Sequence, residues 1–190
     1  SCGEEAWASA VHIRKLIDKA HDKGLPVIYT TGIRRSDNWD AGSWAWKNSR
    51  NAEDATGNPT NLNPNEIIAE IAPSPQDIVI QKRKPSGFAG TDLASYLNLL
   101  DCDSLILTGT TTSGCIRATV LDAFSLNYRV TVAEEACFDR SEVSHAINLC
   151  DMNAKYADVL KTQAVLDFFD TLPQGQCVLP KGANPVPGGG

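Results

Sequence analysis

Short apolar segments and longer amphipathic segments alternate along most of this chain of 190 residues, and this alternation is what most constrains its fold. Apolar runs bounded by Gly, Pro and Asp are typical of buried parallel strands, and apolar residues three and four apart are typical of helices. The pattern therefore predicts an α/β fold, with a doubly wound, mostly parallel sheet in a three-layer α/β/α sandwich. The expected strands are residues 26–33, 77–82, 104–109, 128–133 and 158–161. The expected helices are residues 4–23, 91–99, 114–126, 141–150 and 163–170.

Two segments stand outside this alternation. Residues 34–75 form a long connection that contains three tryptophans and one short expected helix at residues 65–71. We expect the tryptophans to line a pocket or a subunit interface rather than to fill the core, because long connections are usually functional. Residues 173–190 are rich in Pro and Gly and predict a mobile tail. The rest, residues 1–172, is expected to form one domain.

Composition excludes several classes of protein. The formal net charge of -6 argues against a nucleic-acid partner. No apolar run approaches the roughly 18 residues that cross a bilayer, so no membrane partner is expected. The six cysteines form no Cys-x-x-Cys pair, which argues against a zinc ribbon or a thioredoxin site. Buried, reduced thiols in a cytoplasmic protein are the simplest interpretation, and the start of the chain lacks the profile of a secretory signal.

One cysteine lies where an expected strand ends and an expected helix begins. Residues 104–109 form a short apolar strand, small residues follow, and Cys115 falls in the predicted first helical turn. Unpaired amides and the positive end of a helix dipole favour a thiolate there, and the same amides can hold an oxyanion. Cys115 is therefore a candidate nucleophile. The alternative is a small buried residue that fills a strand–helix corner.

A lysine ends the preceding expected strand. Lys82 opens a basic cluster of three residues, and the carboxyl ends of parallel strands meet at one edge of a sheet. Lys82 and Cys115 should therefore lie at the same edge, where an ammonium group would favour the thiolate. The register of the strand points to Lys82 rather than Arg83 or Lys84. The alternative is a solvated basic face made by all three.

At this point the chain resembles a known family, the isochorismatase-like cysteine hydrolases, and within it the branch of N-carbamoylsarcosine amidohydrolase and maleamate amidohydrolase. The resemblance extends from about residue 4 to about residue 169. It is specific because several separated blocks match together. The residues that carry it are Lys82, Cys115, residues 86–93, residues 111–119, Asp139, Arg140, residues 148–152 and residues 155–158.

The resemblance implies a reaction and the roles of four residues. It implies hydrolysis of the C–N bond of a small carboxylate-bearing amide or N-carbamoyl compound, with a thioester intermediate, release of ammonia and a Cys-Lys-Asp triad. Cys115 would be the nucleophile and Lys82 its neighbouring cation. A cis peptide before Thr111 would let the amides of Thr111 and Cys115 form the oxyanion hole. Arg140 would bind the substrate carboxylate, the alternative being a surface ion pair with an adjacent carboxylate.

The resemblance also implies that no cofactor is needed and that the protein forms a homodimer or homotetramer. Zinc-dependent nicotinamidases of the same superfamily carry histidine ligands in the connection before the lysine strand. This chain has no histidine between residues 34 and 81. The remaining histidines, at positions 12, 21 and 145, are scattered. We therefore expect no catalytic zinc and no nicotinamidase activity.

The chain departs from the family pattern in one respect. The family's catalytic aspartate ends an apolar first strand, and no such segment precedes Gly24 here. Without a central strand, two neighbouring strands would keep unpaired backbone groups. We therefore expect an N-terminal strand, with its aspartate, to be missing from these 190 residues. Two alternatives stay open: an isochorismatase-type vinyl ether hydrolase, and an inactive family member that acts as a binding or assembly module.

Overall fold

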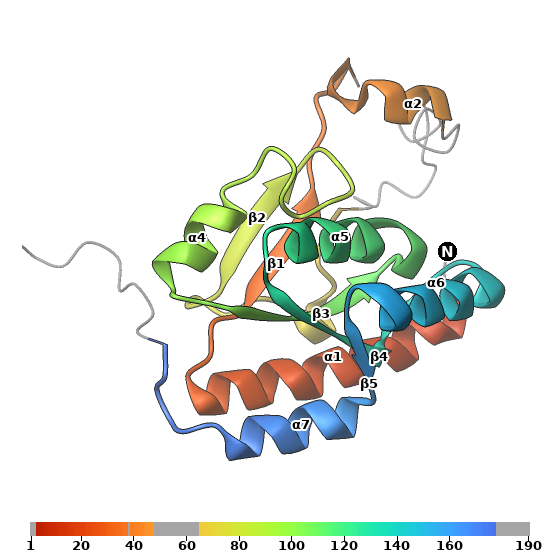
Figure 1. The fold of residues 1–190 in the computed structure, drawn as a ribbon. Coiled ribbons are helices and arrows are strands. Elements are labelled where there is room, and N and C mark those ends of the chain that lie inside the picture. Colours follow the sequence, from red (N-terminus) through yellow and green to blue (C-terminus); the bar gives the residue numbers. More distant parts are fainter. Residues whose placement is uncertain (1–2, 38, 48–64, 178–190) are drawn as a thin grey trace, which may run out of the picture.

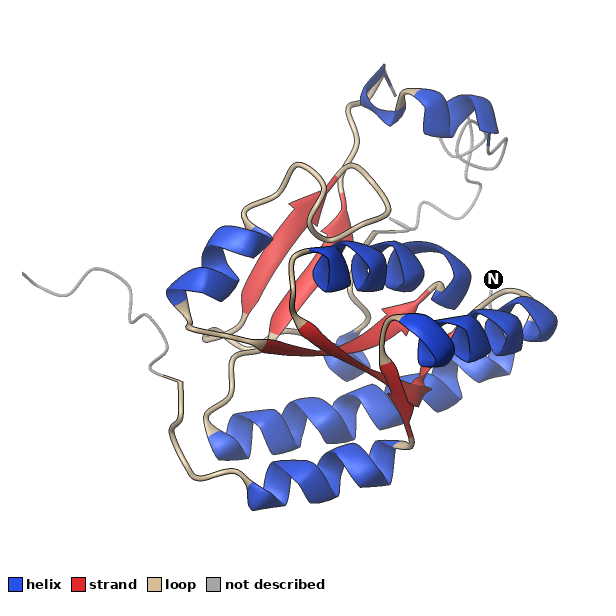
Figure 2. Cartoon of the chain, in the orientation of Figure 1, coloured by secondary structure: helices blue, strands red, loops and turns tan. Residues whose placement is uncertain are grey.

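The computed structural model describes residues 3–37, 39–47 and 65–177, and within them the predicted α/β fold is confirmed (Figure 1). The helices and parallel strands follow the expected order along the chain (Figure 2). None of the helices in these ranges is both long enough and apolar enough to span a membrane. The strands are β1 (Ile28–Gly32), β2 (Ile78–Lys82), β3 (Ser104–Thr110), β4 (Arg129–Phe138) and β5 (Asp158–Leu160). The helices are α1 (Gly3–Lys23), α2 (Ser43–Lys47), α4 (Leu93–Leu99), α5 (Arg117–Ser125), α6 (Glu142–Lys155) and α7 (Thr162–Thr171).

The strands form two parallel sheets instead of one. β1 pairs with β2, from Ile28 opposite Ile78 to Gly32 opposite Lys82. The other sheet has the order β3-β4-β5. No strand in the described ranges joins β1 to β3, so the facing edges of these two strands remain unpaired with each other.

Helices cover both faces of the strands. On one face, α1 and α7 pack side by side, as Figure 1 shows, against the small residues Ala133 and Ala136 of β4. On the other face, α5 and α6 pack on β4 through a cluster that contains Val120, Val132 and Met152, all fully buried. α4 completes this second layer over β1 and β2. The hydrophobic core is therefore divided between the two faces, as expected for a three-layer fold.

Two elements are longer than the sequence predicted. β4 was expected to end at residue 133 but continues to Phe138, past two acidic residues. Glu135 accepts hydrogen bonds from the amide and hydroxyl of Thr162 at 2.6 and 2.8 Å, and Glu134 pairs with Lys161. α6 was expected to end at residue 150 and continues to Lys155. Asp151, just past that expected end, pairs with Arg117 of α5 at 3.3 Å. In both cases tertiary partners, which a local pattern does not contain, satisfy polar residues at the expected end.

The long connection differs from its prediction. Of residues 65–71, only 69–71 are helical, as a short 3-10 turn, so the helix expected there is wrong for its first four residues. A further short helix, α2, was not predicted. Trp39 and Trp46 are 77% and 88% exposed, which agrees with their expected absence from the core. Residues 48–64 of this connection and residues 178–190 of the expected tail lie outside the described residues.

The cysteines are free thiols at the five positions that the structure describes, and their burial varies. Cys137 is buried, and burial raises the pKa of its thiol to about 12. Burial is also the main cause that raises the pKa of Cys102 to about 11. Cys150 on α6 is exposed, so the expectation that the cysteines are buried is wrong there. Cys150 can serve as an exposed reference thiol in labelling experiments.

A buried carboxylate holds α1 against the start of β2. The Asp77 side chain is 1% exposed and accepts hydrogen bonds from His21 Nε2 at 2.7 Å and from the Ser74 amide at 2.7 Å. Burial opposes its ionisation, but these bonds outweigh burial and hold the pKa of Asp77 below its ordinary value of 3.8. A carboxylate with a lowered pKa stabilises the fold fully above its unfolded pKa, and this stabilisation is lost as pH falls through the folded value.

We expect Asp77→Asn to destabilise the protein by about 2–3 kcal/mol at pH 7, because it weakens a buried, charge-assisted network. The deficit should shrink as the pH falls below 3.8 and through the lowered pKa of the folded protein, because the wild-type carboxyl then also becomes protonated. Urea unfolding at neutral pH and below pH 3.8 measures both effects. Asp158→Asn, at an exposed position of β5, is the matched control. A deficit that is independent of pH would contradict the role given to the charge.

Candidate active site

The ends of β2 and β3 bring together the predicted lysine and cysteine. Lys82 is the last residue of β2, and its Nζ lies 3.3 Å from Cys115 Sγ. The side chain of Lys82 is buried, and Nζ also donates to the carbonyl oxygens of Lys84 and Pro85 at 3.1 and 2.9 Å. Arg83 and Lys84 point elsewhere, toward the segment that contains Asp40. The basic cluster is therefore not one solvated face, and only Lys82 contacts the cysteine.

The backbone around Cys115 differs from the predicted helix start. Residues 112–116 form one π-helical turn, and α5 begins only at Arg117. Cys115 is half-buried in that turn, just before α5. The peptide bond between Thr110 and Thr111 is cis, as the family resemblance implied. The expectation of an α-helix from residue 114 is therefore wrong for its first three residues, although Cys115 keeps its place at a strand-to-helix junction.

Two residues that the sequence analysis did not place at the π-helical turn, Asp139 and His145, are hydrogen-bonded to it. Asp139, after the end of β4, accepts a hydrogen bond from the Ser113 amide at 2.7 Å. His145 of α6 is hydrogen-bonded through Nδ1 to Thr112 Oγ1 at 2.8 Å, and the Thr112 side chain is fully buried. Asp139 directly follows a strand that ends at the same edge as β3. The position of Asp139 after a strand was the one signal in the sequence that could have indicated its hydrogen bond to Ser113.

Asp139 is ionised under ordinary conditions. Burial raises its pKa, but hydrogen bonds from Ser113 and the Arg140 amide, together with the nearby Arg140 charge, hold the pKa below 3.8. We expect Asp139→Asn to lower kcat about 10- to 100-fold with a much smaller change in KM, because the turn that carries Cys115 would lose a charge-assisted bond. Steady-state kinetics on an amide substrate measures this difference. An unchanged kcat would contradict the positioning role.

Arg140 lies at the same edge of the sheet, next to Asp139. It is exposed and lines the cavity that also reaches Lys82 and Cys115. In the described part of the chain its guanidinium makes no ion pair within 4 Å with Glu142 or any other carboxylate. Asp139 instead accepts from the Arg140 amide at 2.7 Å. The guanidinium is therefore available to an anionic ligand in the cavity.

The hydrogen-bond partners of Lys82 are two carbonyl oxygens and one thiol, and none is a carboxylate. Among residues 3–37, 39–47 and 65–177, no carboxylate therefore takes a place beside Lys82 Nζ. Within the same ranges no three His, Cys, Asp or Glu side chains are placed to hold one metal ion.

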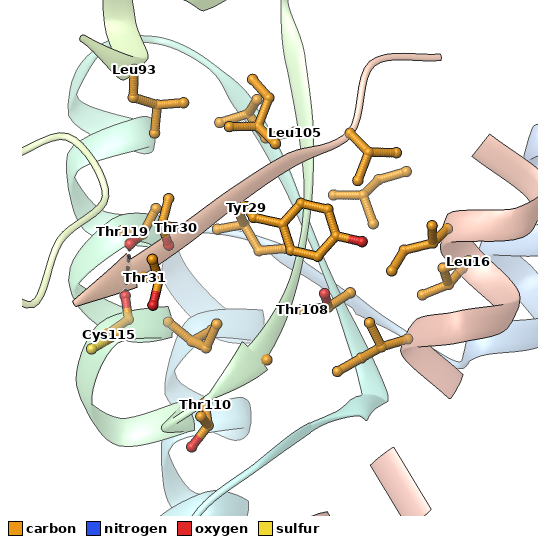
Figure 3. A pocket seen from close by; sticks show the side chains of 18 of the residues that line it. Leu16, Tyr29, Thr30, Thr31, Leu93, Leu105, Thr108, Thr110, Cys115 and Thr119 are labelled. Carbon is orange, nitrogen blue, oxygen red and sulfur yellow. Dashed lines mark hydrogen bonds between the residues drawn. The ribbon is translucent and has the colours of Figure 1, made fainter. Parts of the chain in front are cut away.

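A cavity of about 1950 Å³ opens in front of Cys115 and continues between the two sheets. Figure 3 shows Tyr29, Thr30 and Thr31 of β1 along the cavity, with Cys115 and Thr119 close by. Trp44 and Arg34 line the cavity, and the guanidinium of Arg34 stacks over the Trp44 ring at 5.3 Å. Of the three tryptophans in the long connection, Trp44 is therefore a pocket residue, as predicted.

Known proteins share both the sequence pattern and this fold. An N-carbamoylsarcosine amidase from Arthrobacter sp is 33% identical over 173 residues, which cover 90% of this chain and 64% of that protein. A maleamate amidohydrolase from Pseudomonas putida is 33% identical over 149 residues, which cover 78% of this chain and 68% of that protein. The chain thus spans about two thirds of the length of these relatives. An isochorismatase family protein from Desulfovibrio vulgaris, known from its crystal structure, superposes with a TM-score of 0.77 at 29% identity and covers 88% of this chain and 87% of its own.

The family profile named Isochorismatase domain matches residues 3–164. This range contains the five strands, the Lys82–Cys115 contact and the hydrogen bonds of Asp139 and His145 to the turn. The match covers most of the chain and agrees with the sequence and structure comparisons. The chain therefore belongs to the isochorismatase family.

Proposed function

We propose that the protein is a cysteine hydrolase that cleaves the C–N bond of a small, carboxylate-bearing amide or N-carbamoyl compound and releases ammonia. The observation that carries this proposal is the contact of 3.3 Å between Lys82 Nζ and Cys115 Sγ at the mouth of the cavity. A cationic amine at that distance stabilises a sulfur anion, which is the reactive form of cysteine. A vinyl ether hydrolase has no need for a sulfur nucleophile at this place.

In the first half-reaction, the Cys115 thiolate forms a bond to the substrate carbonyl carbon. The carbonyl π electrons move to oxygen, and the oxyanion accepts hydrogen bonds from the amides of Thr111 and Cys115. The neighbouring amides of Ser113, Gly114 and Ile116 are already bonded, to Asp139 or to the Thr111 carbonyl. When the intermediate collapses, the C–N bond breaks, the nitrogen takes a proton, ammonia leaves and a thioester remains.

In the second half-reaction, water adds to the thioester carbon, the C–S bond breaks and the thiolate returns. One proton must be given to the leaving nitrogen and one taken from the water. The carboxylate of the Cys-Lys-Asp triad, which is not among the described residues, performs both transfers as general acid and then general base. Lys82 stabilises the sulfur anion before it attacks and again when the C–S bond breaks, because Nζ lies within contact of Sγ and is held there by two carbonyls.

The proposed substrate class is supported by the guanidinium of Arg140 in the cavity and by the substrates that the names of the relatives give. N-carbamoylsarcosine, maleamate and ureidoacrylate, which the relatives' names give, each combine a terminal carbamoyl group with a carboxylate. The guanidinium of Arg140 faces the same cavity as Cys115 and offers two parallel donors to such a carboxylate. The protein should therefore prefer anionic amides to neutral amides of the same size.

Two experiments test the proposal. Ammonia release is measured with maleamate, N-carbamoylsarcosine and, as the neutral control, the methyl ester of maleamate. Arg140→Gln should raise KM for the acids about 10- to 100-fold and leave the ester unchanged, whereas Lys15→Gln, the same charge change at an exposed site of α1, should alter neither. Equal use of acid and ester by the wild type would contradict the role of Arg140.

The second experiment does not depend on turnover. The protein is treated with iodoacetamide at pH 7, and alkylation is followed peptide by peptide by mass spectrometry. Cys115 should react at least about tenfold faster than the exposed Cys150, because the Lys82 amine contacts the Cys115 sulfur. The half-buried Cys102 and the buried Cys137, whose pKa values are raised, should react last. A Cys115 no faster than Cys150 would overturn the proposal of a reactive nucleophile.

A further inference from the structure

Thr119 links the turn that carries Cys115 to a loop that is distant in the sequence. It lies on α5, four residues after Cys115, and is 8% exposed. Its hydroxyl donates a hydrogen bond to the Cys115 carbonyl oxygen at 2.7 Å, which Figure 3 shows as a dashed line. Thr119 Oγ1 also accepts a hydrogen bond at 2.9 Å from the amide of Gly87, which lies 32 residues earlier in the chain. One buried hydroxyl therefore joins two separate segments.

The loop that contains Gly87 also holds the amine of Lys82. Lys82 Nζ donates to the carbonyl oxygens of Lys84 and Pro85, and Gly87 follows directly after Ser86 in the same loop. The loop therefore contacts both members of the Lys82–Cys115 pair. Its carbonyls bind the amine, and its Gly87 amide reaches the Cys115 backbone through the Thr119 hydroxyl.

These hydrogen bonds form a closed ring with the contact between sulfur and amine. From Cys115 Sγ the ring passes to Lys82 Nζ at 3.3 Å and to the Pro85 carbonyl at 2.9 Å. It follows the backbone from Pro85 to Gly87 and returns through the Thr119 hydroxyl to the Cys115 carbonyl. The distance between Nζ and Sγ therefore depends on every bond of the ring, including the two that Thr119 makes.

The backbone at Gly87 is closely packed on both sides. A Cβ atom at this position would lie 3.2 Å from Leu93 Cδ2 and 3.5 Å from Thr119 Cγ2. The Gly87 carbonyl accepts a hydrogen bond from the hydroxyl of Thr91, so both polar backbone groups of Gly87 are bonded. Thr91 Oγ1 in turn accepts from the Leu93 amide at the start of α4. The loop is thus fixed between α4 and Thr119.

The bond from Thr119 to the Cys115 carbonyl has no functional meaning by itself, because serine and threonine often bond to the carbonyl four residues earlier in a helix. Ser125, on the same helix, makes this bond to the Leu121 carbonyl at 2.7 Å. Ser125 is exposed, and its hydroxyl makes no second hydrogen bond in the part of the chain that the structure describes. Thr119 differs because it is buried and also binds the loop beside Lys82. Ser125 is therefore a matched control.

We propose that Thr119 is a positioning residue for the Lys82–Cys115 pair. Its hydroxyl fastens the loop to the Cys115 backbone, so that the carbonyls of Lys84 and Pro85 direct Nζ at Sγ. The inference rests on the proposed function, because it gives Thr119 a role in the reactivity of the proposed nucleophile. A residue that acts through the Lys82 amine should affect the chemical step much more than substrate binding.

The first test compares variants that differ in the hydroxyl group of residue 119. Thr119→Val keeps the shape of the side chain without the hydroxyl, whereas Thr119→Ser keeps the hydroxyl without the methyl group. With maleamate and N-carbamoylsarcosine, Thr119→Val should lower kcat about 10- to 100-fold and change KM less than about threefold. Thr119→Ser should stay within about threefold of the wild type in both constants. Ser125→Ala should leave both unchanged.

The second test needs no turnover. Alkylation of Cys115 by iodoacetamide at pH 7 should be about three- to tenfold slower in Thr119→Val, because the amine is still present but no longer directed at the sulfur. Lys82→Met gives the rate without the amine. The double variant Lys82→Met/Thr119→Val should react as fast as Lys82→Met alone, because the effects of two residues do not add when one acts through the other.

Three results would each overturn the inference. The first is a Thr119→Val variant with the kcat and the alkylation rate of the wild type. The second is a Thr119→Ser variant as slow as Thr119→Val, because the hydroxyl would then not be the active group. The third is a double variant that shows the sum of both losses, because Thr119 would then act independently of Lys82.

Thr119→Val places a methyl group against the buried Gly87 amide and can lower the stability of the protein. Thr119→Ala, which leaves that amide free of an apolar group, is therefore made in parallel. Melting temperatures are measured for all variants. Thr119→Ala should show the same direction of change in kcat and in alkylation as Thr119→Val, and wild-type rates in Thr119→Ala would contradict the inference.

Failure of the inference and failure of the proposed function give different results. A wild-type Cys115 that reacts no faster than the exposed Cys150 rejects the proposed function, and the role of Thr119 with it. A wild-type protein with a fast Cys115 and ammonia release, whose Thr119→Val variant behaves in the same way, rejects the role of Thr119 alone.

Discussion

Replacement of Cys115 by alanine is expected to lower kcat/KM for amide hydrolysis by at least about a thousandfold, because the proposed covalent intermediate forms on its sulfur. Cys115 is half-buried in the π-helical turn, so loss of its sulfur should have little effect on folding. Ammonia release with maleamate and N-carbamoylsarcosine measures the loss. Mass spectrometry of the wild type under substrate should show an acyl adduct on the Cys115 peptide.

The matched control is Cys150→Ala, which removes an exposed thiol on α6 that contacts no part of the site. This variant should retain the activity of the wild type. Loss of activity in Cys150→Ala, or turnover that survives Cys115→Ala, would remove cysteine from the mechanism. Survival of isochorismate turnover in Cys115→Ala would point instead to vinyl ether hydrolysis.

Replacement of Lys82 by methionine is expected to lower kcat/KM by about 100- to 1,000-fold, because the sulfur anion loses the cationic amine that contacts it. Methionine keeps most of the volume of the buried side chain. The variant leaves the carbonyls of Lys84 and Pro85 without their donor, so some loss of stability accompanies it. The rate of alkylation of Cys115 by iodoacetamide should fall at least about tenfold. This measurement reports the loss of the amine beside the sulfur separately from the loss of stability.

Lys84→Met is the matched control for this prediction. Lys84 is two residues away, is exposed, and donates to the carbonyls of Asp40 and Ala41 rather than to the cysteine. Its backbone carbonyl, which accepts from Lys82, is unchanged by the substitution. An equal fall in Cys115 alkylation in Lys82→Met and Lys84→Met would mean that general surface charge, and not the contact with Sγ, determines the reactivity.

Local patterns in the sequence predicted most of the fold. The strands that end at Lys82 and begin at Ser104 are short apolar runs with clear polar borders, and their positions agree with the structure within one residue. Parallel strands place their carboxyl ends together, and the structure brings Lys82 and Cys115 into contact at that edge. The end of β4 was mispredicted because Thr162 and Lys161 satisfy the acidic residues that seemed to end it. The end of α6 was mispredicted because Asp151, just past it, pairs with the distant Arg117.

Other features depend on groups that are far apart in the sequence. The Asp139 bond to the Ser113 amide and the His145 bond to Thr112 form only when β4, α6 and the turn pack together. The orientation of Trp44 toward the cavity and the exposure of Trp39 could not be derived from composition, because both lie in the same irregular segment.

The sequence by itself determined the layered α/β fold, the strand order along the chain and the pairing of a lysine with a cysteine, because each follows from periodicity and from the geometry of parallel strands. Only the tertiary structure decided which amides of the turn are hydrogen-bonded and that the strands separate into two sheets with a cavity between them. Those properties depend on the positions of backbone groups in space, and a strand edge has a partner or lacks one only after the whole chain has packed.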